Sequence, residues 1–161
     1  MSDFKRVRAT RLGVALLGIA LASGIWSGSG SAQAQSDDSV VILLNARNPT
    51  QNLSKGDLVK IFLGQTAFWH GVVPVKVLIR PDGSQAAKVF YERVLSTTPQ
   101  AFRKHWDELQ LAGRGVAPRV FGSVEELAQA VTQAPGSIGF ALASEAWTLN
   151  GNKSIKVINP N

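Results

Sequence analysis

Short apolar runs along the chain alternate with segments whose apolar residues recur every three or four positions. Residues 40–44 are consecutive apolar residues, which is typical of a strand buried on both of its faces. Runs at 73–79, 137–142 and 155–158 predict three further strands. The segments between these runs have the spacing of amphipathic helices. Strands that alternate with helices predict an α/β domain with a mostly parallel sheet flanked by helices.

Capping residues predict where several of these helices begin. Ser54 is a typical N-cap residue with an acid, Asp57, three positions later, and Ser123 followed by Glu126 has the pattern of a capping box. Thr98 precedes a proline and a third apolar stripe of helical spacing. The chain of 161 residues is long enough for one domain built from these elements.

The first 34 residues have the pattern of a secretory signal peptide. Four basic residues lie within the first eleven positions, and an apolar run follows at 12–22. Ala32-Gln33-Ala34 then forms an A-x-A site, which predicts a cleaved leader over 1–34 and an exported, periplasmic domain over 35–161. An uncleaved anchor is the alternative, but the apolar run is about half of the roughly 20 residues that a membrane span needs. We therefore expect no membrane insertion after cleavage.

The net charge changes meaning once this leader is set aside. The whole chain has 17 Lys and Arg against 11 Asp and Glu, a balance of +6 that would favour a nucleic-acid partner. A leader with four basic residues and one acidic residue leaves 13 against 10, or +3, and we expect no nucleic-acid binding. The chain has no cysteine, which excludes disulfides, thiolate catalysis and cysteine-based metal sites.

The strongest candidate for chemistry is the turn that follows the second predicted strand. Residues 80–86 read RPDGSQA and lead into a helix. Arg80 can make a bidentate contact with an oxyanion, and Ser84 can donate its hydroxyl proton. The backbone N–H groups of Gln85 and Ala86 would lie at the helix N-terminus, where anions are favoured. These four residues are the predicted ligand-binding residues.

Asp82 and Gly83 are predicted to support this site. The charge of Asp82 would repel a bound dianion, so we expect its carboxylate to orient Arg80 rather than to touch the ligand. A purely structural interpretation stays open, in which Asp82 or Ser84 only caps the helix and Arg80 pairs with Asp82 on the surface.

Other polar candidates are weaker. His70 and His105 have no metal-ligand spacing, and we expect them to be structural or solvated. The loop 113–115 and Arg119 can form a basic rim, although a solvated loop is favoured. No nucleophile and base pair is evident, so we expect no catalytic residue, no metal, no cofactor and no enzymatic activity.

The tryptophans are not interleaved with basic residues. We therefore expect Trp69, Trp106 and Trp147 to pack in the core or at a cleft edge rather than to form a stacking platform.

Three stretches together resemble a known family. They are 53–69, the strand and anion loop at 77–84, and 131–140 with its P-G-S-I-G-F turn. They are similar to the phosphate-binding family of ABC-transporter periplasmic substrate-binding proteins, which has the type 2 periplasmic binding fold. The resemblance covers roughly residues 40–147. It implies that Arg80 and Ser84 contact phosphate and that Asp82 supports the arginine.

The chain departs from this family in two ways. Gln85-Ala86 stands where the family has Gly-Thr, which removes a hydroxyl donor and costs about 1.5–3 kcal/mol of binding. Family members are about twice as long and close two lobes over the ligand, so the chain resembles a short, single-lobe form. The resemblance therefore implies a weak site.

Two functions follow as expectations. The first is an exported protein that binds phosphate or a related oxyanion, related to the substrate-binding component of phosphate ABC transport. The alternative is a degenerate binding-fold module that acts as an interaction or regulatory partner in the envelope. The expected partners are the anion and an ABC permease, a second copy or another envelope protein.

Overall fold

The computed structural model describes residues 39–160 of the chain. The predicted signal peptide and its cleavage site lie outside these residues. Within the described range, no helix combines the length and the apolar character needed to cross a membrane.

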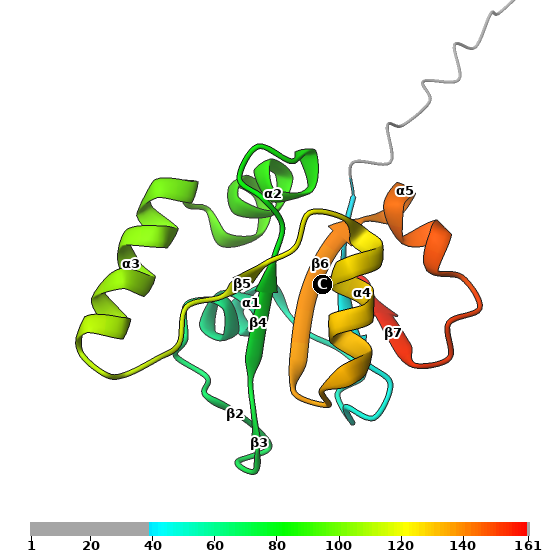
Figure 1. Cartoon of the computed structure of the whole chain (residues 1–161), viewed down its shortest axis with the longest axis horizontal. Helices are drawn as coiled ribbons and strands as arrows, with labels where there is room; N and C mark the ends of the chain where they lie inside the picture. Colours follow the sequence, from blue (N-terminus) through cyan, green and yellow to red (C-terminus); the bar gives the residue numbers. More distant parts are fainter. Residues whose placement is uncertain (1–38, 161) are drawn as a thin grey trace, which may run out of the picture. The chain divides into compact units, whose positions relative to one another are not determined.

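A five-stranded sheet forms the centre of the domain, in the order β5-β4-β6-β1-β7 (Figure 1). Its strands are β1 (Val40–Asn45), β4 (Lys76–Ile79), β5 (Arg119–Val120), β6 (Ser137–Leu142) and β7 (Ile155–Ile158). β4 pairs in parallel with β5 and β6, whereas β1 lies antiparallel between β6 and β7. Four strands therefore point the same way and only β1 is reversed, which confirms the prediction of a mostly parallel sheet.

The helices begin where the capping residues predict. They are α1 (Lys55–Phe62), α2 (Gln85–Val89), α3 (Pro99–Leu111), α4 (Val124–Gln133) and α5 (Ala143–Ala146), with short η1 (Phe90–Leu95) and η2 (Trp147–Leu149) segments. Ser54 and Ser123 form capping boxes, and the hydroxyl of Thr98 accepts a hydrogen bond from the N–H of Ala101 at 3.2 Å. α2 runs directly into η1, which has π-helical geometry.

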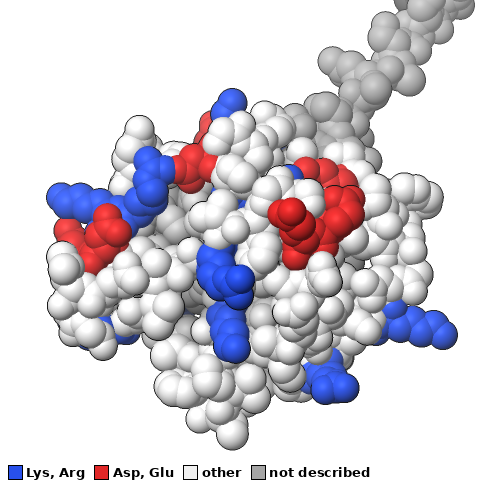
Figure 2. Space-filling model, viewed as in Figure 1, with Lys and Arg blue, Asp and Glu red and all other residues white. Residues whose placement is uncertain are grey.

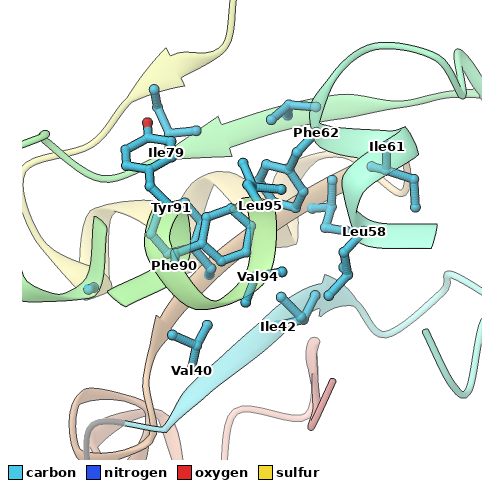
Figure 3. Close-up of a cluster of buried hydrophobic side chains, with 14 of the residues drawn as sticks. Val40, Ile42, Leu58, Ile61, Phe62, Ile79, Phe90, Tyr91, Val94 and Leu95 are labelled. Atoms are coloured by element: carbon cyan, nitrogen blue, oxygen red, sulfur yellow. The ribbon is translucent and has the colours of Figure 1, made fainter. Parts of the chain in front are cut away.

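Apolar side chains cover both faces of the sheet. Ile42 and Leu44 pack against α1, α2 and η1 on one face, and Val41 and Leu43 pack against α4 on the other. This arrangement explains the continuous apolar run of β1, because successive side chains of a strand point to opposite faces. Figure 3 shows Phe62, Phe90 and Tyr91 in the first of these clusters.

The strand predicted over 73–79 is in fact two strands. β3 (Val73–Pro74) pairs with β2 (Phe68–Trp69) in a small hairpin, and β4 begins only at Lys76. The N–H of Val75 donates to the carbonyl of Ala67, and the N–H of Lys76 donates to the carbonyl of Gly136, both at 2.9 Å. The chain therefore changes hydrogen-bonding partner at this point, which divides the apolar run.

Candidate functional site

Arg80 directly follows β4, at the edge of the sheet where the parallel strands end. β4 and β6 run in the same direction, so α2 and α5, which follow them, begin at that same edge (Figure 1). Val77 and Ile79 pack toward α1 and α2, whereas Leu78 packs toward α4. By this alternation Arg80 faces the α4 side of the sheet. Carboxyl-terminal edges of this kind are the usual ligand sites of open α/β sheets.

The guanidinium of Arg80 is buried and only partly hydrogen-bonded. Its side chain is 7% exposed, and Nη2 donates to Oε1 of Glu145 at 3.1 Å. Nε and Nη1 have no hydrogen-bond partner among residues 39–160. A buried donor without an acceptor costs about 1–3 kcal/mol, and more for a charged group. The arginine therefore keeps two nitrogens available at considerable cost.

Unpaired buried polar atoms of this kind are concentrated at Arg80. In the described part of the chain, the other such side-chain atoms are Nδ2 of Asn48 and the hydroxyl of Tyr91. Arg80 alone contributes two of these atoms and is the charged member of the set. Native structures pair nearly all buried polar groups, so this charged exception makes Arg80 the strongest candidate for a ligand contact in the described residues.

Ser84 caps α2 and lies at the end of the predicted anion turn. Its Oγ accepts a hydrogen bond from the N–H of Ala87 at 3.2 Å, and its own N–H donates to the carbonyl of Pro81 at 2.8 Å. Gln85 and Ala86 occupy the first two helical positions, whose N–H groups have no intrahelical acceptor. The capping part of the structural interpretation is therefore correct. Capping uses Ser84 as an acceptor and leaves its hydroxyl proton available to donate.

Asp82 forms no hydrogen bond or ion pair with Arg80. Its carboxylate forms an ion pair with Arg103 of α3, and the carboxylate against Arg80 is that of Glu145 in α5. The expectation that Asp82 orients Arg80, and the alternative of an Arg80–Asp82 surface pair, are both replaced by these contacts. Gly83 is exposed, and a Cβ built on it would meet nothing within 4 Å. Its position in the turn therefore does not depend on close packing.

Sequence reasoning missed Glu145. It lies 65 residues from Arg80, in a four-residue helix too short to show an apolar period. Its Oε2 accepts the N–H of Leu142 at 3.0 Å, so the carboxylate is held at the start of α5 while Oε1 contacts Arg80. A Glu three residues after a strand end was the available signal, but Leu142 is not a typical N-cap residue.

The charges around Arg80 are acidic. Glu125 and Glu126 lie in the first turn of α4, where Figure 2 shows acidic side chains gathered on the surface. The pKa of Glu125 is lowered mainly by a hydrogen bond from its own backbone N–H, with smaller contributions from Thr148, Ser123 and the charge of Arg80. Arg80 is thus a cation placed among carboxylates, which limits how much negative charge a ligand can bring.

One cavity among the described residues reaches this edge. It has a volume of about 350 Å³ and is lined by Arg80, Pro81 and Asp82 together with residues of α3 and the apolar side chain of Val120. A cavity of about 560 Å³ is lined by the beginning of β4 and the end of α4. Glu145 and Ser84 line neither cavity, so the first cavity approaches Arg80 from the side of α3.

The remaining candidates have structural surroundings. A ring nitrogen of His105 lies 2.8 Å from the carbonyl of Leu63, and His70 is exposed in a turn. Among residues 39–160, no three His, Cys, Asp or Glu side chains form a group that could hold a metal ion. The loop 113–114 is exposed, and the guanidinium of Arg119 lies 5.3 Å from the ring centre of Phe121. These positions form no second anion site with Arg80.

Two of the three tryptophans behave as predicted. Trp69 and Trp106 are buried, and their Nε1 atoms donate to the carbonyls of Gly136 and Phe62 at 2.9 and 3.0 Å. Trp147 is 76% exposed, so the expectation that it packs in the core or at a cleft edge is wrong. It follows α5 directly, and η2 is too short to bury it.

The sequence matches no protein-family model, and no curated protein is similar to it. The structure, in contrast, is similar to solved structures. PstS from Borrelia burgdorferi gives a TM-score of 0.59 at 15% identity, over 76% of this chain and 47% of that chain. A second structure is that of a Clostridium perfringens protein, described as a phosphate ABC transporter substrate-binding protein and solved with bound phosphate. Its TM-score is 0.57 at 16% identity, over 74% of this chain and 44% of that chain. An ABC-type phosphate transport receptor from Vibrio cholerae gives a TM-score of 0.53 at 20% identity, over 76% of this chain and 48% of that chain.

This is the fold of the phosphate ABC-transporter binding proteins. The expectation drawn from the three motif stretches is therefore confirmed at the level of the fold. The chain spans less than half of the length of each of these proteins. At identities of 15–20% the similarity shows only that the fold is shared. The site residues are therefore argued from the contacts in this structure.

Proposed function

We propose that the protein binds phosphate or a related oxyanion at the edge formed by Arg80 and the start of α2. One observation carries this proposal: the buried guanidinium of Arg80 has two nitrogens without a partner. A tetrahedral oxyanion supplies several acceptors, and an arginine is the side chain best suited to hold it by paired N–H groups. The function is capture and release of the anion without making or breaking a bond.

The start of α2 would supply the remaining donors. The N–H groups of Gln85 and Ala86 are free of intrahelical partners, and the Ser84 hydroxyl can donate one hydrogen bond. Each hydrogen bond to a charged group contributes about 1.5–3 kcal/mol, and millimolar binding requires about 4 kcal/mol. Arg80 with two or three such donors exceeds this amount, and the freedom that the anion and the side chains lose on binding offsets the surplus, so we expect weak, millimolar binding.

The similar structures support this assignment. The proteins from Clostridium perfringens and Vibrio cholerae are described as phosphate transport or binding proteins, and the first of them was solved with phosphate bound. None of them is described as an enzyme, which agrees with a binding role for this chain. We extend the proposal to a role beside an ABC permease, which is the partner class that such binding proteins serve.

Titration calorimetry with phosphate and with sulfate tests the proposed site. We expect saturable binding by the purified protein and loss of that binding in Arg80→Met. The matched control is Arg114→Met, which removes the same charge from an exposed loop residue. Ser84→Ala should weaken binding by about tenfold, the equivalent of one hydrogen bond to a charged group. Binding that survives unchanged in Arg80→Met contradicts the assignment.

Export is the second part of the proposal. A leader over 1–34 with a cleavage site at Ala32-Gln33-Ala34 would release a chain that begins at Gln35. N-terminal sequencing of the protein recovered from the periplasm is expected to read Gln-Ser-Asp-Asp. A full-length protein recovered only from the cytoplasm would contradict export.

A further inference from the structure

The Glu145 carboxylate already accepts a hydrogen bond from one nitrogen of Arg80, the residue that the proposed ligand would contact. Its Oε1 lies 3.1 Å from Nη2 of Arg80, and its Oε2 is held by the N–H of Leu142. The Glu145 side chain is 29% exposed, whereas that of Arg80 is 7% exposed. Arg80 and the carboxylate at its side therefore form a fixed pair, in which the arginine still has two nitrogens to offer.

A ligand on Nε or Nη1 would share the guanidinium with this carboxylate. The three nitrogens of a guanidinium surround one carbon, so an anion on any of them lies within a few ångströms of Oε1 of Glu145. At such distances two like charges repel strongly, and the repulsion grows in proportion to the charge of the ligand. Partial exposure of Glu145 screens this repulsion but does not remove it.

We propose that Glu145 determines the selectivity of the anion site by making it favour singly charged over doubly charged oxyanions. This inference rests on the proposed function of Arg80 and adds a residue to it. A dianion meets twice the repulsion that a monoanion of the same shape meets. For phosphate, the site would then favour the form that carries two protons over the form that carries one.

Glu125, in α4, would also disfavour a doubly charged ligand. It lies in the first turn of α4, and its carboxylate interacts through space with Arg80. Its Oε1 accepts a hydrogen bond from the Thr148 hydroxyl at 3.3 Å, and it makes no hydrogen bond with the arginine. Its effect on a ligand should therefore be smaller than that of Glu145.

Glu145→Gln separates this role from a purely structural one. Glutamine keeps one oxygen, which can accept from Leu142, so α5 can keep its start. It removes the charge and places an amide NH2 group where Oε1 accepts from Arg80. The matched control is Glu108→Gln, which removes a charge from an exposed residue whose ion pair with Lys104 spans 4.0 Å. A structural role alone would change both anions equally, because it has no dependence on ligand charge.

The experiment compares sulfate with perchlorate, which are both tetrahedral and differ by one charge at neutral pH. Calorimetric titration of Glu145→Gln is expected to show tighter binding by about tenfold per unit of ligand charge, that is about tenfold for perchlorate and about a hundredfold for sulfate. Glu108→Gln should change neither. An equal gain for both anions, or no gain, overturns the assignment of Glu145.

The outcomes keep this inference apart from the proposed function. If the unaltered protein binds anions through Arg80 and Glu145→Gln does not change the ratio of the sulfate and perchlorate affinities, only the inference fails. If neither protein binds either anion, both fail. If only Glu145→Gln binds, and binds sulfate more tightly than perchlorate, the carboxylate is shown to limit the site. Should Glu145→Gln not fold, Glu125→Gln must also strengthen the binding of sulfate more than that of perchlorate, by a smaller factor.

Discussion

Asn45 and Arg80 are both buried polar residues at strand ends, but at opposite edges of the sheet. Asn45 ends β1, which runs against β6, and Arg80 follows β4, which runs with it. The Nδ2 of Asn45 donates to the carbonyls of Val131 and Thr132 at 2.9 and 3.0 Å, and its Oδ1 accepts the N–H of Arg47 at 2.9 Å. Arg80 uses one nitrogen of three.

The difference separates a polar side chain whose donors all have partners from one that, by our proposal, keeps two donors for a ligand. Asn45 satisfies its own groups and joins β1 to the end of α4, so its hydrogen bonds contribute to stability. Arg80 leaves donors unpaired, which opposes stability. Burial alone does not distinguish the two residues; the number of donors with partners does.

The edge opposite the proposed anion site should be the more sensitive to a small structural change. A Cβ at Gly136 would lie 1.9 Å from the carbonyl oxygen of Pro74, and the Gly136 carbonyl accepts the Nε1 hydrogen bond of Trp69. Gly136→Ala is therefore expected to lower the free energy of unfolding by about 3 kcal/mol or more. Urea denaturation measures this change. A loss below about 1 kcal/mol would contradict the close approach.

Asn45→Ala should have the next largest effect. It leaves one buried and one partly buried carbonyl of α4 without these donors, so we expect a loss of about 2–3 kcal/mol in the free energy of unfolding. Asn52→Ala, at an exposed position, is the matched control and should change stability little. Phosphate affinity should be the same in both folded variants, because Asn45 lies at the other edge.

Tyr91 provides a second unpaired buried group, one without a ligand-binding role. Its hydroxyl has no partner, so Tyr91→Phe is expected to raise the free energy of unfolding by about 1 kcal/mol and to leave anion binding unchanged. Thermal unfolding and phosphate titration measure the two effects. A loss of binding in this variant would remove the distinction between Tyr91 and Arg80.

The same tyrosine predicts a pH dependence. Burial raises the pKa of Tyr91 from 10.0 to about 12, so the folded protein holds the phenol proton more tightly than the unfolded chain does. The contribution of the protonated Tyr91 phenol to the free energy of unfolding is fully present below pH 10 and is lost as the pH rises from 10 toward 12. Stability should therefore fall in that interval, and less steeply in Tyr91→Phe. Equal slopes for the two proteins would show that the phenol is not buried.

Arg80→Met should have the smallest effect on stability and the largest on binding. It removes a buried charge with two unpaired nitrogens, and the carboxylate left behind in Glu145 is partly exposed to water. We expect the free energy of unfolding to change by less than about 1 kcal/mol, because the two effects oppose each other. A loss comparable with that of Asn45→Ala would show that Arg80 is a structural residue.

The elements that could be predicted from the sequence are those with local signals. The run at 40–44, the capping pairs Ser54–Asp57 and Ser123–Glu126 and the turn before α2 all lie where they were expected. Local hydrogen bonds and side-chain periodicity decide such elements. The position of Arg80 at a strand end followed by a helix was predictable for the same reason.

Features that depend on distant contacts could not be predicted. β5 has two residues, and its pairing with β4 gives no periodic signal. The pairs Arg80–Glu145 and Asp82–Arg103 join separate elements, so sequence proximity favoured the wrong partner for Arg80. The exposure of Trp147 depends on what surrounds η2, which the residue type does not reveal.

The most direct test of the central claim is the NMR signal of the Arg80 Nε–H, assigned by its absence from Arg80→Met. If the unpaired Nε is held for an oxyanion, adding phosphate should shift this signal and slow its exchange with water, as expected for a donor that gains an acceptor. The arginine signals of Arg103 and Arg114 should stay in place. An Arg80 signal that does not move, while another arginine responds to phosphate, would contradict the account.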